Sequence, residues 1–500
     1  MRLGPSSPAS LEISAVRRTR LAVALSALVV ALPACGGGGS DGPSDLVYAG
    51  LTPVEPTAGT WQTWIVPSVV AIRPAAPPTG FSTQTTQELV DLRARALARG
   101  PVQTANVDDW NAGACRRWNE FQLGLIVTRS TNPPKASRGL ALVSVAMFDA
   151  MVSAYDTKYH YLRPRPSAFI NPPATYGPIP DSPGYASDRA AISKAAAEVL
   201  KYLFPLDVAA IDARLQQALD AELDSCACFQ SDVDAGVAIG QAVATQVLAY
   251  AAGDHGDDPQ PAYVASGIPG RWAPTPAAFA AALLPGWGSV KTWHLANGSA
   301  YRPGSPPAYN SAEWIAQRDE VLAVNLSLPA NPQRSAIATF WADGGGTWTP
   351  PGHWNDIAMD LAITEGFNEC RTTRMLALLN TAQADAFVAC WDCKYHYDIE
   401  RPISAIRRDV AGQATWVPFI ATPPFPSYPS GHSSTSGAAS QVLGYVFPAS
   451  AVMLATMASE AKDSRLYGGI HYRFDNDTGL DLGRSIGTLA IERAATDGAP

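Results

Sequence analysis

The sequence has few charged residues, and acidic residues outnumber basic ones. Charged residues make up 16% of the 500 positions, and the formal net charge is -8. Residues 1–34 contain four arginines and one glutamate, so the remainder of the chain is near -11. Nucleic-acid-binding proteins need a basic surface, so this charge disfavours nucleic acid as a partner. An anion can bind such a chain only where cations are gathered locally.

Long apolar runs are scarce. The clearest, residues 21–32, has twelve residues and is shorter than the roughly 20 that a membrane-spanning helix requires. No later segment is predicted to span a bilayer. Three arginines precede the run, which predicts an export signal, residues 1–34. Ala34-Cys35 and a glycine run follow, as in bacterial lipoprotein signals. We expect Cys35 to carry a lipid anchor on the periplasmic or cell-surface side; an ordinary cleaved signal is the alternative.

Alternating β-branched runs are also scarce, whereas apolar residues often recur three and four apart, which predicts an all-α fold. The 42 prolines and 40 glycines gather between the helical stretches and predict long ordered loops. Residues 35–84 read as a tether and N-terminal extension. Residues 256–350, rich in Pro, Gly and Trp, read as a connecting segment that packs on the core.

Cysteines are few, and export would permit disulfides among them. After Cys35 there are six: Cys115, Cys226, Cys228, Cys370, Cys390 and Cys393. Cys370 and Cys390 are expected on one helix, about 30 Å apart at 1.5 Å per residue, so they should not bond each other. The spacing Cys390-x-x-Cys393 alone is weak evidence for a metal or redox site.

The chain contains an internal repeat. Lys158-Tyr-His-Tyr and Arg165-Pro recur 236 residues later as Lys394-Tyr-His-Tyr and Arg401-Pro. Further along, residues 199–205 match residues 442–448 at a shift of 243. A duplicated helical module predicts two pseudo-symmetric helical bundles. We assign residues 85–255 to a degenerate N-terminal bundle and residues 351–500 to a catalytic C-terminal bundle.

Three blocks of the second copy hold polar groups that a core would not contain. In the first, Lys394 and Arg401 lie seven residues apart, which predicts one helix face with two stacked cations. Such a pair is favourable if an anion lies between the two; a solvated face is the alternative. Pro402 is expected to end or bend this helix.

In the second block, Ser430-Gly431-His432 precedes a run of small residues with helical character. Ser430 and Gly431 are therefore expected at a helix N-terminus, where free N–H groups and the helix dipole favour an oxyanion. His432 would lie beside this anion site as an acid–base group. A capped helix start with an exposed histidine is the alternative.

In the third block, Arg465 and His471 are separated by two glycines that could turn both side chains inward. Asp475 lies four residues after His471 and could orient the imidazole. The first copy lacks this set, because Arg465 corresponds to Glu222 and His471 to Cys228. We therefore interpret the first bundle as a scaffold. The remaining histidines, including His353, are expected to have packing roles.

Together, the motifs Lys-x6-Arg-Pro, Pro-Ser-Gly-His and Ser-Arg-x5-His-x3-Asp resemble the signature of the type 2 phosphatidic acid phosphatase and vanadium haloperoxidase superfamily. The segments around Ser430 and His471 resemble the haloperoxidase branch in particular. The resemblance covers most of residues 110–497 through the repeat. It implies vanadate as the cofactor, with hydrogen peroxide and halide as reactants. The oxidised halide can then react with a small organic acceptor in solution.

The resemblance also implies a role for each matching residue. His471 would be the ligand of vanadium, and His432 the acid–base group beside the apical oxygen. The oxyanion-binding groups would be Lys394, Arg401, Arg465, Ser430 and the Gly431 N–H, with Lys394 also polarising the peroxide. Trp391 and Phe425 resemble the halide pocket of fungal chloroperoxidases. Asp343 resembles a carboxylate that pairs with Arg465.

Two other functions fit parts of the sequence. An acid phosphatase could use the same residues, with His471 attacking phosphorus and His432 protonating the leaving group. The double bundle, Trp391 and Phe425 favour the haloperoxidase. A lipoprotein that uses the fold only as an interaction scaffold is disfavoured, because the residue set of the second copy is intact.

Overall fold

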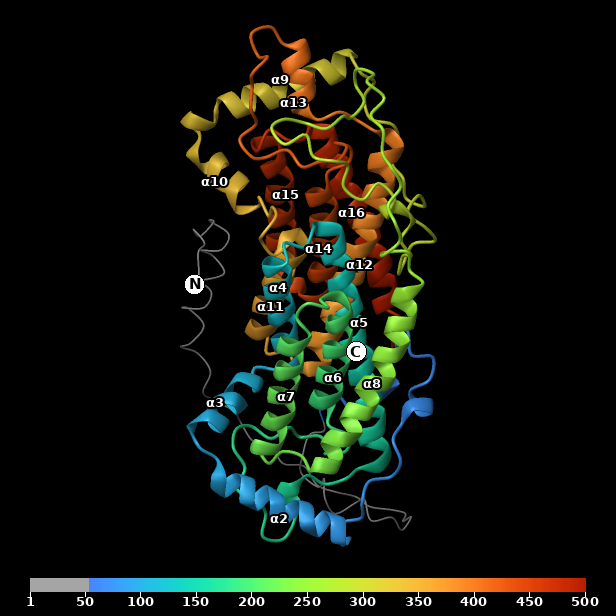
Figure 1. Ribbon diagram of the computed structural model, residues 1–500, viewed down its shortest axis with the longest axis vertical. Coiled ribbons are helices and arrows are strands. Elements are labelled where there is room, and N and C mark those ends of the chain that lie inside the picture. The colour runs from blue at the N-terminus through green and yellow to red at the C-terminus, as the bar shows by residue number, and fades with distance from the viewer. Residues whose placement is uncertain (1–53) are drawn as a thin grey trace, which may run out of the picture.

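The computed structural model describes residues 54–500, and over this range the chain is helical. It forms no β-strand there, only one isolated bridge between Arg271 and Ile399. The all-α expectation is confirmed. Figure 1 shows the N-terminal helices in the lower half of an elongated molecule and the C-terminal helices in the upper half. The expected signal and Cys35 lie outside the described residues.

The helices fall into two groups and a linking pair. The N-terminal bundle contains α2 (Thr83–Ala98), α3 (Pro101–Trp110), α4 (Ala114–Thr128), α5 (Pro133–Tyr161), α6 (Asp188–Leu203), α7 (Val208–Asp224) and α8 (Gln230–Ala252). The C-terminal bundle contains α11 (Thr349–Thr364), α12 (Glu369–Tyr397), α13 (Pro402–Asp409), α14 (Gly431–Val446), α15 (Ala451–Tyr467) and α16 (Arg473–Ala494). Between them lie α9 (Ala312–Leu326) and α10 (Pro332–Phe340).

The repeat is present in the structure. At a shift of 236, α5 starts and ends where α12 does, and at a shift of 243 the same holds for α6 with α14 and α7 with α15. Equivalent helices also have equivalent caps: Asn132 and Asn368 accept a backbone N–H three residues on, as do Ser187 and Ser430. These side chains satisfy N–H groups that the helix leaves free. The two bundles therefore follow one local plan.

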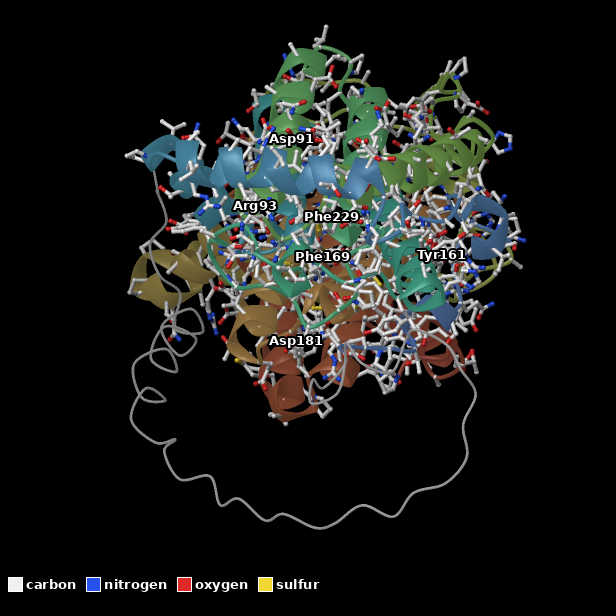
Figure 2. The ribbon with its side chains drawn as sticks, turned by 90° about the horizontal axis from the view of Figure 1, so that it is seen from below. Asp91, Arg93, Tyr161, Phe169, Asp181 and Phe229 are labelled. Carbon is white, nitrogen blue, oxygen red and sulfur yellow. The ribbon has the colours of Figure 1, made fainter. Side chains whose placement is uncertain are left out.

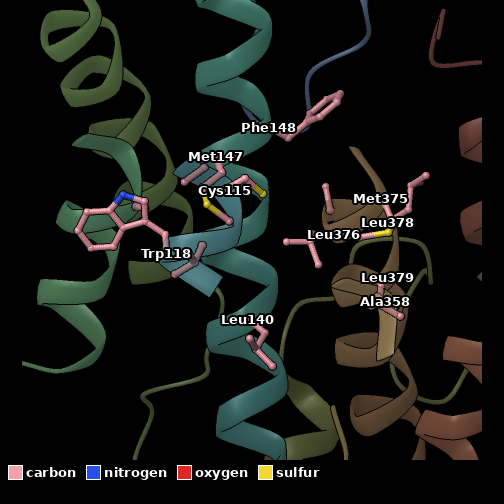
Figure 3. Packing of buried hydrophobic residues seen from close by; sticks show 14 of the residues in the cluster. Cys115, Trp118, Leu140, Met147, Phe148, Ala358, Met375, Leu376, Leu378 and Leu379 are labelled. Carbon is pink, nitrogen blue, oxygen red and sulfur yellow. The ribbon is translucent and has the colours of Figure 1, made fainter. Parts of the chain in front are cut away.

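The two copies pack about their own equivalent residues. Asn119 donates to Asn355 at 2.9 Å, and Asn380 donates to Ser144 at 2.9 Å, each pair 236 residues apart. Contacts between equivalent positions are what a twofold relation produces. Both bundles share one interior along α5 and α12; Figure 3 shows Met147 and Leu376 among its buried side chains.

Part of the expected tether belongs to the repeat as well. The carboxylate of Asp149 accepts the backbone N–H groups of residues 64–66, as the carboxylate of Asp385 does from residues 293–295. Trp61 is 3% exposed. Within the described part of residues 35–84, which were expected to be a tether and N-terminal extension, residues 58–66 pack on the N-terminal bundle and cap the buried Asp149; we call this segment the strap.

The connecting segment also has more structure than expected. Residues 287–302 form the matching strap on the second bundle, and α9 and α10 follow. At a shift of 229 only a few residues are shared, among them Gly59 with Gly288 and Arg73 with Arg302. Arg73 pairs with Asp156 and Arg302 with Asp392, both at 2.8 Å. Because so few residues are identical at this shift, the sequence comparison that found the repeat did not detect this part of it.

Two surface cavities lie at equivalent positions of the two copies. One, of about 560 Å³, is lined by residues that include Arg138 and Tyr202. The other, of about 470 Å³, is lined by the equivalent Arg374 and Tyr445. Neither cavity includes a residue of the predicted catalytic set. Duplication has therefore preserved surface features as well as helices.

Two helices are longer and more apolar than the sequence reading suggested. By length and composition, α5 and α8 could each cross a membrane. The apolar window of α5 is 94% buried inside the protein, as in the core helix of a bundle, and that of α8 is 44% buried. All six cysteines among residues 54–500 are buried and free, in agreement with the expectation that Cys370 and Cys390 do not bond each other.

Candidate active site

The candidate anion-binding site begins at the N-terminus of α14. Ser430 is the N-cap, and its hydroxyl oxygen lies 3.4 Å from the Ser433 N–H that it accepts. The hydroxyl proton of Ser430 remains available to a ligand, and Gly431 opens the helix with a free N–H. Both residues are buried. This helix end offers donors and a positive dipole, as expected for an oxyanion site.

Lys394 lies in the last turn of α12 with a fully buried side chain. Its ammonium donates to the carbonyls of Pro426 (2.9 Å), Ser427 (2.9 Å) and Pro429 (2.5 Å) in the loop before α14. Burial lowers its pKa to about 7, because no carboxylate contacts it directly. An anion beside this ammonium would restore its pKa.

Arg401 is not on the helix that carries Lys394, and that expectation was wrong. The helix ends at Tyr397, because Asp398 adopts a left-handed conformation with φ 54°. Arg401 follows as the N-cap of α13. Its Nε donates to the Phe425 carbonyl at 2.7 Å and its Nη1 to the Ile470 carbonyl at 2.9 Å. The chain bend, rather than helical spacing, brings the two cations together.

His471 lies between α15 and α16 and is held on both sides. Its Nδ1 is 2.9 Å from Asp475 Oδ2, so the carboxylate takes the ring N–H as expected. Its Nε2 lies 3.1 Å from Arg401 Nη1. Ser427 Oγ donates to the same Asp475 oxygen at 2.5 Å. The imidazole therefore presents the lone pair of Nε2 toward Arg401, which suits a ligand or a nucleophile. Burial, followed by the nearby cations, lowers its pKa well below the usual value.

His432 and Arg465 form the other side of the site. His432 Nε2 lies 3.2 Å from Arg465 Nη1 and 3.3 Å from the carbonyl of Ala342. A neutral ring can accept from the guanidinium and a protonated ring can donate to the carbonyl, so the nitrogen is placed to change protonation state. Burial and then the charge of Arg465 lower the His432 pKa well below its usual value.

Arg465 is held by the C-terminal end of α10. Its guanidinium donates to the carbonyls of Trp341 and Ala338 and to Ser464 Oγ. Carbonyls at a helix C-terminus carry partial negative charge, which suits a cation. Burial lowers the Arg465 pKa to about 10.

The expected pairing of Asp343 with Arg465 is not made. Asp343 instead contacts Nδ1 of His353 at 3.0 Å, and the His353 ring stacks on Trp341 with centroids 4.6 Å apart. The charge of Asp343 still acts on Arg465 and raises its pKa against the effect of burial. Asp343 follows the carbonyls that hold Arg465, and its backbone has φ 40°, which turns its side chain to His353. His353 therefore packs against Trp341 and holds the Asp343 carboxylate, in keeping with the packing role expected from sequence.

Trp391 and Phe425 form an aromatic wall beside the cations. Their ring centroids are 4.8 Å apart, and Lys394 Nζ lies 5.0 Å from the Phe425 centroid. The Arg401 guanidinium carbon lies 4.7 Å from the same ring. Trp391 is 1% exposed, and its indole N–H donates to the Leu283 carbonyl of the connecting segment. The pair is thus a buried wall of the site.

In the first bundle, the equivalent site is occupied by carboxylates of the protein itself. Lys158 donates to the Pro183 carbonyl at 2.7 Å, as Lys394 does to the equivalent Pro426. Its ammonium also pairs with Asp188 at 3.0 Å, and Ser187 donates to Glu222 at 2.8 Å. The cations of the first copy are therefore neutralised internally.

In the second copy, no carboxylate of residues 54–500 pairs directly with the equivalent cations, and this lack of a counter-ion fits an anionic cofactor. Lys394, Arg401 and Arg465 are each fully buried, and Nη2 of Arg401 has no hydrogen-bond partner. Buried charges and buried donors are normally paired. Among residues 54–500 no three His, Cys, Asp or Glu side chains gather as a metal cation would require. The donor set therefore suits an oxyanion such as vanadate or phosphate, and His471 Nε2 lies beside it.

Sequence reasoning found the motif residues and missed their supports. Ser427 and the carbonyls of Trp341 and Ala342 were not identified. Ser427 belongs to the same proline-rich stretch as Ser430, which could have marked it. Backbone carbonyls leave no signal in the sequence.

Comparison with known proteins agrees with this geometry. The family model of the second helical-bundle domain of vanadium chloroperoxidase matches residues 374–455 and 449–497. Vanadium chloroperoxidase of Curvularia inaequalis is 28% identical over 188 residues, and the match covers 30% of this chain and 30% of that protein, so less than a third of the relative's length is spanned.

Solved structures give a longer match. The structure of a bacterial vanadium-dependent iodoperoxidase aligns with a TM-score of 0.64 and 27% identity, over 76% of this chain and 96% of that one. A bacterial vanadium-dependent chloroperoxidase shares the fold, with a TM-score of 0.54, 18% identity and coverage of 73% and 93%. These matches show that residues 374–497 resemble the second helical-bundle domain of vanadium chloroperoxidase, and that most of the chain is similar in fold to bacterial vanadium-dependent haloperoxidases.

Proposed function

We propose that this protein is a vanadate-dependent haloperoxidase that oxidises halide with hydrogen peroxide to hypohalous acid. The observation that carries the proposal is the excess of buried cations around His471 Nε2, with an unpaired Arg401 Nη2 and no carboxylate like Asp188 of the first copy. Hydrogen bonds to charged groups contribute roughly 1.5–3 kcal/mol each, so several together support tight binding of a small oxyanion.

Each side chain has a distinct task. His471 Nε2 would hold the cofactor, with its orientation fixed by Asp475 and Ser427. Lys394, Arg401 and Arg465 would neutralise the charge of its oxygens. Vanadate would supply a Lewis-acid centre that activates peroxide without a change of oxidation state.

The overall reaction consumes one proton for each halide oxidised. Peroxide, halide and a proton give hypohalous acid and water. We infer that His432 delivers this proton, with support from its Nε2, which lies 3.2 Å from Arg465 Nη1 and 3.3 Å from the Ala342 carbonyl oxygen. Burial and then the charge of Arg465 lower the His432 pKa, and a bound anion would offset the second of these effects and raise the pKa.

The aromatic wall favours this function over a phosphatase. Trp391 and Phe425 are nearly fully buried against Lys394. Peroxide and halide are small, whereas a phosphatase must admit an ester group and release it. A desolvated aromatic wall next to cations also suits a large, weakly hydrated halide.

The test compares both activities in one preparation. Purified protein loaded with vanadate should oxidise iodide and bromide more readily than chloride, because these ions lose electrons more easily. Phosphate should inhibit by competing for the same cationic site. Phosphate-ester hydrolysis by the vanadate-free protein should be slow and should disappear on loading. Brisk ester hydrolysis without any halide oxidation would favour the phosphatase.

We also propose that Cys35 is the mature N-terminus and carries the lipid anchor. The support is the short apolar run of residues 21–32 followed by Ala34-Cys35 and glycines. Mass spectrometry of the membrane fraction should show an acylated Cys35. A Cys35→Ser chain should move to the soluble fraction. Cleavage elsewhere without an acyl group would contradict this.

A further inference from the structure

An apolar surface lies at the end of the molecule farthest from the C-terminal bundle. Within the described residues, the three most exposed large hydrophobic side chains are Phe81 (102%), Ile170 (93%) and Leu97 (90%). Val90 (48%) and Val102 (77%) accompany them. Figure 1 shows α2, which carries Val90 and Leu97, crossing the lower end. We call these five residues the α2 face.

Members of the α2 face are close in space. Val90 and Leu97 are seven residues apart on α2, so they share one side of the helix. Arg93, one turn from each, donates to the carbonyls of Ile170 and Asn171. A Cβ placed on Gly80, next to Phe81, would lie 3.5 Å from the Phe169 ring. In Figure 2, which looks at this end, Arg93 and Phe169 are labelled on the same face.

The described chain begins at the same end. The N–H of Val54 donates to the Asp181 carbonyl at 3.2 Å, and its own carbonyl accepts from Tyr159 near the end of α5, shortly before Arg163, which pairs with Glu88 of α2. Eighteen residues separate Cys35 from Val54. A chain of that length reaches at most about 65 Å, at roughly 3.4 Å per residue. A lipid on Cys35 would therefore hold this end, rather than the C-terminal bundle, near a bilayer.

We propose that the α2 face docks on a lipid bilayer, beside the anchor on Cys35. This inference rests on the proposed anchoring for its choice of partner, and not on the haloperoxidase activity. Exposed apolar patches mark interaction surfaces, and side chains that protrude from an interfacial helix insert among lipid headgroups. The docked molecule stands upright, with the C-terminal bundle directed away from the lipid (Figure 1).

The first experiment measures lipid contact directly in the full lipidated protein. A fluorophore sensitive to polarity is attached at Leu97→Cys in one sample and at Val452→Cys in another, since Val452 is 82% exposed on α15 of the other bundle and the native thiols are buried. On reconstitution into phosphatidylethanolamine and phosphatidylglycerol vesicles, the probe at 97 should shift to the blue and be quenched by a lipid-borne quencher. The probe at 452 should not change. Equal responses at the two positions, or none at 97, would overturn the docking.

The second experiment removes the anchor and keeps the face. A Cys35→Ser chain should bind vesicles weakly, and Phe81→Ser with Leu97→Ser and Ile170→Ser should weaken that binding at least tenfold. Leu206→Ser with Val452→Ser is the matched control, since both side chains are about 80% exposed elsewhere. Far-UV circular dichroism and thermal melting confirm that every variant is folded.

The outcomes separate the two proposals. Acylated Cys35 without a probe response would refute the docking and leave the anchor. An unacylated Cys35 with vesicle binding that depends on Leu97 would refute the anchor and leave the docking. If sedimentation shows a dimer that the triple substitution dissolves, a second copy covers the face and the docking is wrong.

Discussion

The carboxylate of Asp188 lies 3.0 Å from the ammonium of Lys158, at the chain position where the C-terminal bundle has Gly431. Lys158 and Lys394 are otherwise bound alike, each to carbonyls of the loop before the next helix. Asp188, together with Glu222 in place of Arg465, therefore distinguishes the closed first site from the open second site. In the first bundle the protein supplies the anion itself, and in the second the anion must come from solution.

Replacing Asp188 should open the first site. Asp188→Gly removes the counter-ion of a fully buried Lys158, and loss of one partner of a buried pair costs about 3–5 kcal/mol. Sulfate or phosphate should recover part of this stability by taking the place of the carboxylate. Thermal melting with and without sulfate measures this recovery, which should stay partial because Glu222 remains in the first site.

Asp188→Asn is the matched control, because it keeps the volume of the side chain and blocks the site. It should be destabilised without any rescue by anions. The same anion response in both variants would show that Asp188 does not stand in for an oxyanion.

The reverse change should close the second site. A Cβ on Gly431 would lie 3.5 Å from the Trp391 ring and 3.6 Å from Phe387, so a side chain fits there. Gly431→Asp should abolish binding of vanadate and phosphate, and should raise the free energy of unfolding by about 1–3 kcal/mol because buried cations gain a partner. Gly431→Asn should retain much of the binding. Calorimetry and thermal melting measure both effects; unchanged binding in Gly431→Asp would contradict the assignment.

Vanadate-dependent activity should depend on His471 but not on Cys228, the equivalent residue of the first bundle. His471→Ala removes the proposed protein ligand and should reduce vanadate-dependent activity by more than the roughly 10–100-fold that loss of an outer-shell partner costs. Cys228→Ala, the equivalent change in the first bundle, should leave activity nearly unchanged. Equal losses would mean that the working site is misassigned. Vanadate binding by equilibrium dialysis gives the same comparison without turnover.

Oxyanion affinity should depend on pH through Lys394. Its pKa is lowered to about 7 by burial, and a bound anion raises it. Binding therefore takes up a proton above pH 7, so affinity should be constant well below pH 7 and fall, by at most about tenfold per pH unit, as the pH rises above it. Sulfate is a suitable probe because its own charge is constant over this range.

Lys394→Arg provides the control, since arginine stays charged throughout. Its sulfate affinity should vary less between pH 6 and 9, as measured by calorimetry in buffers of different ionisation enthalpy. An unchanged pH profile in this variant would assign the proton to another group.

Local sequence was sufficient for the long helices of the second bundle and for the motif residues of the candidate site. The caps Asn368 and Ser430, and the apolar spacing along α12 and α14, depend on residues a few positions apart, and the structure follows them. The motif residues are likewise grouped in three short blocks. The internal repeat could be read because Lys158 and Arg165 recur with their neighbours.

Other features required the folded chain. The left-handed Asp398 ends α12 before Arg401, and no helical period reports such a bend. Asp343 pairs with His353 rather than Arg465 because α10 presents its carbonyls to the guanidinium. The strap that covers Asp149 comes from residues 64–66, more than eighty positions away.

The sequence by itself determined which chemical groups the site contains and that the module is duplicated, because both are encoded by residue identity and short-range spacing. Only the tertiary structure decided that Lys158 is neutralised by Asp188 while Lys394 is not. The physical reason is that the charge balance of a buried site depends on every group within a few ångströms. Those groups come from helices and loops that meet only when the bundles pack.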